Sequence, residues 1–526
     1  MKKELLQEEQ GVLRLAAPKK KGLLRLVFSR LFLIAALLLV QILLFVGLYG
    51  WFREYIPHFT AFQILFLIFM VLYLFNNDMD SSAKLTWLMI LAVFPIPGAV
   101  FLAYTQTNLG HRAVKQRVDQ LITETKDMIP QEEKVLCALD DDWSDTDDLY
   151  RYINRSGCFP IYENTEVRYF PLGEDKFAAM LEELEKAEQF IYMEYFIIEE
   201  GYMWGRILDV LARKAKAGVD VRVMYDGMCE ITTLPHDYPK RLNELGIRAK
   251  MFSPITPFVS THYNYRDHRK ILVIDGKVAF NGGVNLADEY INRRERFGHW
   301  KDTALMLRGE AVRSFTLMFL QMWNLTEKES DFSAAAVLPE KVRAAGYVMP
   351  YCDDPLDADK VGESVYMDIL YRANRYVHIM TPYLILDGEL EAALKYAAER
   401  GIDVKLILPG IPDKKAAYAL AKSHYRFLTD AGVKIYEYTP GFVHAKVFVS
   451  DDSKAVTGTI NLDYRSLYHH FECATYLYQV PCISDMEADF QATLSKCRAV
   501  TPETIRAEKL FYKLLGSFMK IIAPLM

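Results

Sequence analysis

Two short stretches of the sequence carry the same five residues at the same spacing. Each reads His-x-Lys-x4-Asp-x6-Gly-x2-Asn, and the second copy lies 176 residues after the first. The repeated residues are His268, Lys270, Asp275, Gly282 and Asn285, then His444, Lys446, Asp451, Gly458 and Asn461. A single chance match has a probability on the order of one in ten thousand per chain. The pair therefore indicates an internal duplication, which any fold of this chain must accommodate.

The duplication extends to the predicted secondary structure around these stretches. Apolar periodicity indicates the order helix, strand, helix, strand in each copy. The predicted elements are 175–189, 190–198, 204–218 and 219–227 in the first copy, and 363–375, 376–385, 389–401 and 402–410 in the second. A strand, helix and strand at this spacing form a βαβ unit. We therefore predict an α/β fold with two pseudo-symmetric halves, 151–335 and 336–500, each a mixed β-sheet flanked by helices.

The repeated residues have a geometry that suits phosphate chemistry. Side chains alternate along a strand, so the histidine and the lysine of one copy point to the same face. The Asp-Gly pair at 275–276 is a hairpin-turn signal, and the glycines at 282–283 let the backbone pass close to a bound group. Two copies facing one another place two histidines and two lysines around one anionic centre. A phosphodiester fits there, because the lysines neutralise its oxygens and the amides of Asn285 and Asn461 can donate to them.

The paired motif resembles the HKD motif of the phospholipase D superfamily, and most of the chain, apolar segments included, looks like bacterial cardiolipin synthase. The stretches that carry this closer likeness are 266-RDHRKILVIDG-276, 282-GGVNLADEY-290, 298-GHWKDTALML-307, 381-TPYLI-385, 431-AGVKIYEYTPGFVHAKVFVSDD-452 and 458-GTINLDYRSLYHHFE-472. The resemblance implies two phospholipase D-like domains. It also implies a phosphatidyltransferase that joins two phosphatidylglycerols into cardiolipin and releases glycerol.

The chemistry that the resemblance implies is a two-step exchange through a covalent phosphohistidine. One neutral histidine attacks phosphorus while the other, protonated, donates to the leaving alkoxide and then deprotonates the incoming alcohol. An unperturbed histidine pKa of about 6.5 makes both protonation states accessible near neutrality. The N-terminal copy often supplies the nucleophile in the superfamily, so we assign attack to His268 and acid–base work to His444.

The predicted site consists of a catalytic set and a substrate-binding or orienting set. The candidate catalytic set is His268, Lys270, Asp275, His444, Lys446 and Asp451. Within it, Asp275 and Asp451 are expected to brace the site rather than touch substrate. The resemblance also implies that a later carboxylate orients each histidine, and Asp302 and Glu472 stand in those places. Asn285 and Asn461, together with these two carboxylates, complete the predicted substrate-binding or orienting set, although the asparagines could instead cap turns.

Neighbouring residues favour plainer interpretations. A histidine taken alone on a strand is most often solvated, and only their pairing makes His268 and His444 catalytic candidates. His469 and His470 lack such a pairing and are interpreted as structural or surface residues. Glu194 lies in a buried apolar strand, where a lone carboxylate is costly, so we expect it to be paired or to line the site.

The first hundred residues predict an integral membrane protein. Residues 1–30 form a basic segment with eight Lys and Arg against three Glu. Three apolar runs follow, at 31–49, 59–75 and 85–104. The first has the length and purity of a membrane span, and the third is interrupted by Pro95, Pro97 and Gly98. We predict two or three spans within 31–105.

The membrane side of the catalytic halves depends on the number of spans. The positive-inside rule keeps the basic N-terminus cytoplasmic, so two spans leave the halves inside and three place them outside. Basic residues after the third run also prefer the inside, and we lean towards a cytoplasmic site on the cell membrane. Residues 106–150 are predicted to form a helical linker. The amphipathic segment 501–526 fits either a core-packing helix or a helix on an anionic membrane surface.

Composition narrows the classes of function. The net charge of −6 argues against a nucleic-acid binder, and the hydrophobic fraction of 51% suits contact with lipid. The seven cysteines are scattered, without a CxxC, and are predicted to be reduced thiols. The sequence contains neither a GxxxxGK[ST] loop nor an acidic motif resembling that of metal-dependent CDP-alcohol transferases. We therefore predict no cofactor and no metal requirement.

Three other functions compete with the leading one. The nearest is another HKD lipid enzyme, of the phospholipase D or phosphatidylserine synthase type. An HKD nuclease is disfavoured by the apolar segments and the negative charge. A catalytically silent membrane scaffold is disfavoured because both motifs are complete.

Overall fold

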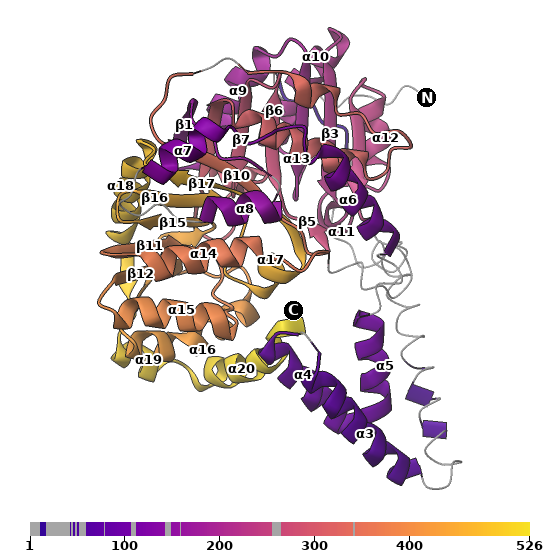
Figure 1. Ribbon diagram of the computed structural model, residues 1–526, viewed down its shortest axis with the longest axis vertical. Helices are drawn as coiled ribbons and strands as arrows, with labels where there is room; N and C mark the ends of the chain where they lie inside the picture. Colours follow the sequence, from indigo (N-terminus) through magenta and orange to yellow (C-terminus); the bar gives the residue numbers. More distant parts are fainter. Residues whose placement is uncertain are drawn as a thin grey trace.

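The computed structural model describes residues 11–16, 43, 46, 47, 50, 51, 59–77, 79–106, 112–141, 149–157, 159–254, 265–339 and 342–525. Its body consists of two β-sheets, one from each predicted half, flanked by helices (Figure 1, magenta for the first half and orange to yellow for the second). The basic segment 1–30, apart from 11–16, and most of the apolar run 31–49 lie outside the described residues.

The first sheet has the strand order β1-β9-β7-β6-β2-β3-β4. Its strands are β1 (Thr165–Phe170), β2 (Phe190–Tyr195), β3 (Asp220–Asp226), β4 (Arg248–Phe252), β6 (Lys270–Ile274), β7 (Val278–Gly282) and β9 (Ala304–Gly309). β2, β3 and β4 run parallel, because helices connect them, and the remaining neighbours are antiparallel. This is the mixed sheet that the βαβ pattern predicts.

The second sheet repeats the order of the first, as β10-β17-β16-β15-β11-β12-β13, with β18 added at its edge. Its strands are β10 (Tyr347–Asp353), β11 (Tyr376–Met380), β12 (Asp403–Pro409), β13 (Lys434–Tyr438), β15 (Val447–Ser450), β16 (Lys454–Gly458), β17 (His470–Tyr478) and β18 (Cys497–Ala499). Each strand of the first half therefore has a counterpart in the second. The predicted pair of mixed-sheet halves is confirmed.

The helices of the predicted series are also present in both halves. They are α9 (Gly173–Glu185) and α10 (Tyr202–Lys216) in the first, and α14 (Val361–Arg372) and α15 (Gly388–Glu399) in the second. Other helices of the body are α11 (Met228–Thr232), α12 (Tyr238–Asn243), η3 (Asp288–Ile291), η4 (Ser333–Ala336), α16 (Lys415–Asp430) and α17 (Tyr464–Tyr468). The chain leaves α10 and α15 through Gly218 and Gly401, both with the positive φ that glycine adopts readily.

A hydrophobic core shared by both halves lies between the sheets. Helix α13 (Val312–Asn324) is buried on almost every side and packs on β2, β6, β7 and β9 of its own half and on β10 of the other. Its counterpart α18 (Cys482–Leu494) packs on β11, β13 and β15, and also on β1. One apolar cluster joins Tyr192 and Phe319 of the first half to Val449 of the second. The two halves are therefore fixed relative to each other by buried apolar surface.

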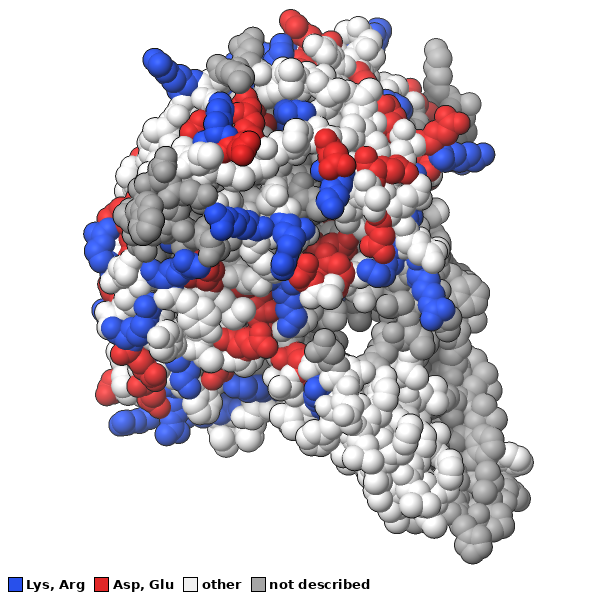
Figure 2. Space-filling model, viewed as in Figure 1, with Lys and Arg blue, Asp and Glu red and all other residues white. Residues whose placement is uncertain are grey.

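Three apolar helices project from the body: α3 (Phe59–Phe75), α4 (Ser81–Val93) and α5 (Pro95–Gln106). The third apolar run forms two helices because Pro95 disfavours helical backbone at Phe94, which has φ −132° and ψ 76°. Lys84 is the one charged residue in the three helices, and Figure 2 shows their surface as almost uncharged. Among the described residues, no helix combines the length and the apolar character needed to cross a membrane.

The segments on either side of these helices pack on the body. The predicted linker contains α6 (Arg112–Thr125) and α7 (Glu133–Asp141), followed by α8 (Leu149–Gly157), and α6 contacts α13 while α8 contacts β10. At the N-terminus, Val12 and Leu13 are buried against the first half. The Leu13 N–H donates to the Gly205 carbonyl at 3.0 Å. A Cβ at Gly205 would lie 2.5 Å from Val12, so the absence of a side chain there makes room for the N-terminal segment.

The C-terminal segment forms two helices, α19 (Pro502–Ala507) and α20 (Leu510–Ile522), and a final turn η5 (Ala523–Leu525), rather than the single helix expected over 501–526. One face of α20 packs on α16, where a Cβ at Gly516 would lie 2.3 Å from the Ala419 carbonyl oxygen. Leu510, Leu514 and Phe518 are exposed. The helix thus packs on the body through one face and presents an apolar face to the outside.

Candidate active site

His268 is positioned by a strand of the opposite half. The short strand β5 (Arg266–Asp267) pairs in parallel with the start of β17, and the His268 N–H donates to the Phe471 carbonyl at 2.9 Å. Because side chains alternate along β17, the residues before and after Phe471 both face His268. One of them is Glu472, whose Oε1 lies 2.9 Å from His268 Nδ1. The carboxylate that orients the first histidine therefore belongs to the second half.

His444 is positioned in the reciprocal way. The strand β14 (Gly441–Val443) pairs in parallel with β8 (His299–Lys301), and the His444 N–H donates to the Lys301 carbonyl at 2.7 Å. His444 Nδ1 lies 2.7 Å from Asp302 Oδ2, so a carboxylate of the first half orients the second histidine. The structure thus brings all four predicted residues together, with the carboxylates crossed between the halves.

Each lysine folds back onto the histidine of its own motif. Lys270 Nζ donates to the His268 carbonyl and lies over the ring of Phe196, and Lys446 Nζ donates to the His444 carbonyl. Lys446 Nζ also lies 3.2 Å from His444 Nε2. Both lysines are almost completely buried. Two buried ammonium groups therefore lie beside the two imidazoles.

Burial dominates the protonation of these groups. Loss of hydration lowers the pKa of His268 well below its usual value and lowers the pKa of His444 to about 4. Burial likewise lowers the pKa of Lys270 to about 8 and that of Lys446 to about 7. The neighbouring His444 holds the pKa of the Asp302 carboxyl below its ordinary value against the opposing effect of burial. In the empty site both imidazoles are neutral, each donating from Nδ1 to a carboxylate and leaving Nε2 as a base or nucleophile.

Asp275 and Asp451 lie away from the histidines. Asp275 accepts three backbone hydrogen bonds of 2.8 Å, from Glu188, Gln189 and Phe190, in the hairpin between β6 and β7. Asp451 accepts the equivalent bonds from residues 374–376. Each aspartate lies seven positions after its histidine along nearly extended chain, a distance of about 23 Å at the usual rise per residue. The aspartate of each motif therefore fixes a turn at the end of the strand that lies away from the histidine.

The two asparagines differ in their contacts. Asn285 accepts from the Ile197 N–H at 3.0 Å and donates to the Tyr290 hydroxyl at 2.8 Å, while the Tyr290 ring packs edge-on against His444. Asn461 Oδ1 is buried and has no hydrogen-bond partner within the described ranges. Asn285 therefore links the chain after β2 to Tyr290 instead of capping a turn, and phosphate contact by either amide stays a prediction.

The paired glycines in the first copy make room for protein rather than for a ligand. A Cβ at Gly282 would lie 2.5 Å from Ala304 Cα on β9, and a Cβ at Gly283 would lie 2.1 Å from Asp302 Oδ1. In the second copy Thr459 takes the place of Gly283, and its hydroxyl donates to Glu472. The surroundings of the two carboxylates thus differ. Asp302 fits because Gly283 has no side chain, whereas Glu472 accepts a hydrogen bond from the Thr459 hydroxyl.

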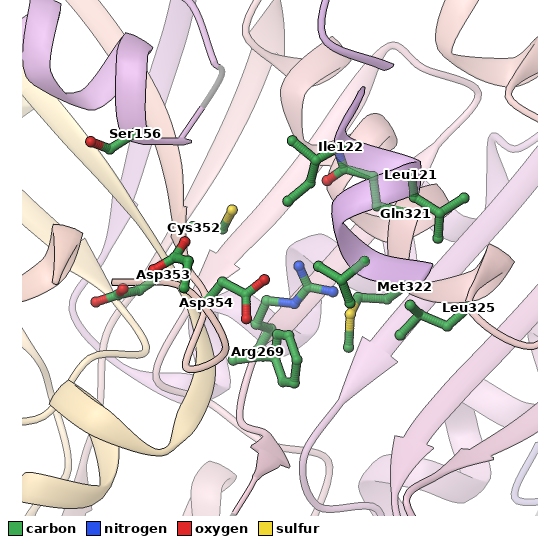
Figure 3. Close-up of a pocket in the computed structure, with 13 residues that line it drawn as sticks. Leu121, Ile122, Ser156, Arg269, Gln321, Met322, Leu325, Cys352, Asp353 and Asp354 are labelled. Carbon is green, nitrogen blue, oxygen red and sulfur yellow. The ribbon is translucent and has the colours of Figure 1, made fainter. Parts of the chain in front are cut away.

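Behind the catalytic strand, Arg269 points to the face opposite His268 and Lys270. It forms a buried ion pair with Glu194, with Nε donating to Oε1 at 2.6 Å, so Glu194 is paired rather than part of the site. Figure 3 shows Arg269 with the carboxylate of Asp354 turned toward it, at a cavity of about 50 Å³ between the halves. This buried polar network anchors the strand that carries the first motif.

His470, which the sequence analysis interprets as structural or surface, and Trp300, which it does not single out, adjoin the histidines of the two motifs. The ring centroid of His470 lies 5.2 Å from that of His268, and the ring centroid of Trp300 lies 5.4 Å from that of His444. The only available signal was their position two residues before Glu472 and Asp302. Donor atoms of His268, His470 and Glu472 all lie within 4.8 Å of one another, an arrangement that could hold a transition-metal ion.

The duplicated mixed-sheet fold and the crossed histidine–carboxylate pairs, each with its lysine, define a two-half enzyme site of the phospholipase D type. A family model described as "Cardiolipin synthase, PLD-like domain" matches residues 180–323 and 366–494. The chain belongs to this family.

Two relatives and one solved structure are similar to the chain over most of its length. A cardiolipin synthase of Alkalihalophilus pseudofirmus is 32% identical over 472 residues, covering 88% of this chain and 92% of the relative. An uncharacterized protein of Streptococcus mutans serotype c is 59% identical over 457 residues, covering 87% of this chain and 99% of that protein. The crystal structure of phosphatidylserine synthase from Haemophilus influenzae Rd KW20 has a TM-score of 0.54 at 15% identity, covering 72% of this chain and 97% of that one, and supports the fold alone.

Proposed function

We propose that this protein is a phosphatidyltransferase of the cardiolipin synthase type, which converts two phosphatidylglycerols into cardiolipin and glycerol. The observation that carries the proposal is the crossed arrangement of two histidine–carboxylate pairs with a buried lysine beside each histidine. Such a site can exchange one phosphodiester for another without external energy. Membership of the cardiolipin synthase family supports phosphatidylglycerol as the donor and the acceptor.

In the first step, His268 Nε2 attacks phosphorus and forms a P–N bond. The bond from phosphorus to the glycerol headgroup oxygen breaks, and that oxygen takes a proton from His444 as glycerol leaves. In the second step, His444 removes a proton from the headgroup hydroxyl of another phosphatidylglycerol. The resulting oxygen attacks phosphorus, the P–N bond breaks, and cardiolipin is released with both histidines restored.

Substrate charge prepares the second histidine for its acid role. In the empty site burial is the main reason that the pKa of His444 falls to about 4, with Lys446 adding to the effect. A bound phosphodiester brings a negative charge next to both groups and opposes this shift. Proton uptake on binding would therefore convert His444 from a neutral imidazole into a proton donor. His268, held by Glu472, would attack in its neutral form.

Product analysis by mass spectrometry tests the activity. The purified protein in phosphatidylglycerol micelles is expected to release equal amounts of cardiolipin and glycerol, and the His444→Ala variant is expected to release neither. Phosphatidic acid as the product would indicate a phospholipase D, and transfer to added serine from a CDP-activated lipid would indicate a phosphatidylserine synthase type. Absence of every product with folded protein would favour the scaffold and overturn the proposal.

We further propose that the projecting helices place the enzyme on the cell membrane. α3, α4 and α5 expose many large apolar side chains, among them Leu65, Leu72, Phe75, Leu85 and Val93. The exposed apolar face of α20 lies close by, because the Thr86 hydroxyl of α4 donates to the Ile521 carbonyl at 2.6 Å. An exposed apolar surface of this extent is typical of contact with lipid.

The N-terminal segment supports a cytoplasmic site. Residues 11–16 precede every apolar run and pack on the first half, where the Arg241 guanidinium donates to the Leu15 carbonyl at 2.6 Å. Segments in contact occupy one compartment, so the chain would cross the membrane an even number of times between them. This favours two crossings over three. By the positive-inside rule the basic N-terminus would then keep both the N-terminal segment and the catalytic halves on the cytoplasmic side.

Maleimide labelling tests this orientation. A cysteine placed ahead of Met1 and the exposed native Cys137 are both expected to be protected from an impermeant maleimide in intact cells. Both are expected to react in inside-out vesicles. Labelling of one site from outside and the other from inside would contradict an even number of crossings.

A further inference from the structure

His470 is the residue of β17 that shares a face with Glu472. Its neighbour Phe471 accepts the His268 N–H at 2.9 Å, which presses this face of the strand against the first catalytic histidine. Phe196 packs on both imidazoles, with ring centroids 4.9 Å from His268 and 6.3 Å from His470, and Lys270 lies over the same ring. His470 therefore belongs to the group of side chains that encloses His268.

The polar atoms of His470 are not used to hold the fold. The residue is only 7% exposed, and neither ring nitrogen has a hydrogen-bond partner in the part of the chain that the structure describes. Nδ1 lies 3.5 Å from Glu472 Oε1, beyond the usual range of roughly 2.7–3.2 Å for such a bond. That carboxylate is already engaged by His268 and Thr459. A structural histidine at this depth would be expected to have partners, since a buried polar atom without one costs free energy.

The other half shows what is distinctive about this position. Trp300 lies two residues before Asp302, as His470 lies two before Glu472, and it adjoins His444 as His470 adjoins His268. The indole Nε1 of Trp300 is also buried without a partner in the described residues. Each catalytic histidine thus has an unused ring nitrogen beside it. An indole can only donate a hydrogen bond, whereas an imidazole can donate, accept or carry a proton.

We propose that His470 contacts the substrate, donating a hydrogen bond to a non-bridging oxygen of the phosphoryl group held between the two motifs. The inference rests on the proposed function, because it requires a phosphodiester at this centre. The contact would lie on the His268 side, where it adds a third imidazole to the two supplied by the motifs. The phosphoryl group would provide the partner that the protein itself does not.

Binding of tungstate, a tetrahedral oxyanion, tests the contact without any lipid. Titration calorimetry compares the wild type with His470→Phe, which keeps a flat ring without a donor, and with His470→Gln, which keeps an N–H donor. Samples are first treated with a chelator, because His268, His470 and Glu472 could also bind a metal ion. We expect His470→Phe to weaken tungstate binding about tenfold and His470→Gln to restore most of it. The same order is expected in kcat/KM for cardiolipin formation.

The adjacent His469 provides the matched control. It follows α17 and its N–H donates to the Arg465 carbonyl, so His469→Gln is expected to leave tungstate affinity unchanged. If His470→Phe lowers the melting temperature but binds tungstate like the wild type, His470 is structural and the proposal is wrong. If His470→Phe weakens tungstate binding but the wild type makes no cardiolipin, the lipid assignment fails while the contact stands. If the wild type makes cardiolipin but binds no tungstate, the contact at this centre is overturned while the lipid assignment stands.

Discussion

The two halves share one fold but surround their histidines differently. His444 lies among Tyr290, Trp300 and Phe442, an aromatic wall, and its carboxylate partner occupies space left by Gly283. His268 instead lies beside Phe196 and His470, and its carboxylate partner is held by the Thr459 hydroxyl. The strand order is common to both, so duplication explains the framework. Around the histidines the halves differ in the side chains that adjoin each imidazole, and the proposed mechanism gives the two histidines unequal roles.

The largest expected effect comes from removing either histidine. His268→Ala and His444→Ala are each expected to lower cardiolipin formation by at least about a thousandfold, because each step needs both groups. A phosphatidyl ester of p-nitrophenol separates the roles, since its leaving group needs no proton. Release of p-nitrophenol, followed by absorbance, is expected to recover partly in His444→Ala and not in His268→Ala. The opposite pattern would show that His444 is the nucleophile.

Exchanging each orienting carboxylate for its amide tests the crossed arrangement. Asp302→Asn and Glu472→Gln are each expected to lower kcat by about a hundredfold, because the amide can stabilise the wrong tautomer. Asp302→Asn should impair the acid–base role of His444 and so be rescued by the p-nitrophenyl substrate. Glu472→Gln should impair attack by His268 and should not be rescued. If each carboxylate variant instead resembled the alanine variant of the histidine in its own half, the crossed pairing would be wrong in solution.

The sequence predicted the two β-sheets better than it predicted which carboxylate pairs with which histidine. Alternation on strands and the βαβ spacing are local properties, and they located both sheets and placed His268 with Lys270. The crossing of Asp302 and Glu472 depends on how β5 and β14 pair with the opposite half, and no local pattern contains that contact. The role of His470 was missed for the same reason. Its significance arises from its distance to a residue about two hundred positions away.

The pH dependence of anion binding gives a smaller contrast between the halves. Burial lowers the pKa of Lys446 to about 7 and that of Lys270 to about 8, so the empty site loses its lysine charges as pH rises through this range. Bound tungstate favours the charged lysines and raises both pKa values, so binding takes up protons and weakens with rising pH, by about tenfold for each unit and each lysine involved.

Calorimetry in buffers of different ionisation enthalpy measures that proton uptake. Lys446→Met is expected to lower the proton uptake near pH 7 to the part that His444 contributes and to leave the uptake near pH 8 unchanged. Lys270→Met is expected to lower the uptake near pH 8 and to leave that near pH 7. Lys277, an exposed residue of the hairpin between β6 and β7, supplies the matched Lys277→Met control. Affinity that stays constant across the range would contradict the lowered pKa values.

The smallest effect on catalysis is expected from the aspartates of the two motifs. Asp275→Asn keeps a residue that tolerates the positive φ of 53° at this turn, but it weakens three backbone hydrogen bonds. We expect a loss of about 2 kcal/mol of stability for Asp275→Asn and about 1 kcal/mol for the more exposed Asp451→Asn. Thermal unfolding in detergent measures this. Activity per folded molecule should stay within about twofold, and a loss like that of the histidine variants would make these aspartates catalytic after all.

The crossed carboxylates also bear on how such a chain can evolve. A single half would contain a histidine without its orienting carboxylate, and a carboxylate with no histidine to orient. An ancestral single-length polypeptide with this geometry would therefore have needed a second copy of itself to complete either pair. After the two copies were joined in one gene, their sequences no longer had to be identical. A residue could then change in one half while its counterpart in the other half stayed the same. The two halves differ in this way at two pairs of corresponding positions, Gly283 with Thr459 and Trp300 with His470.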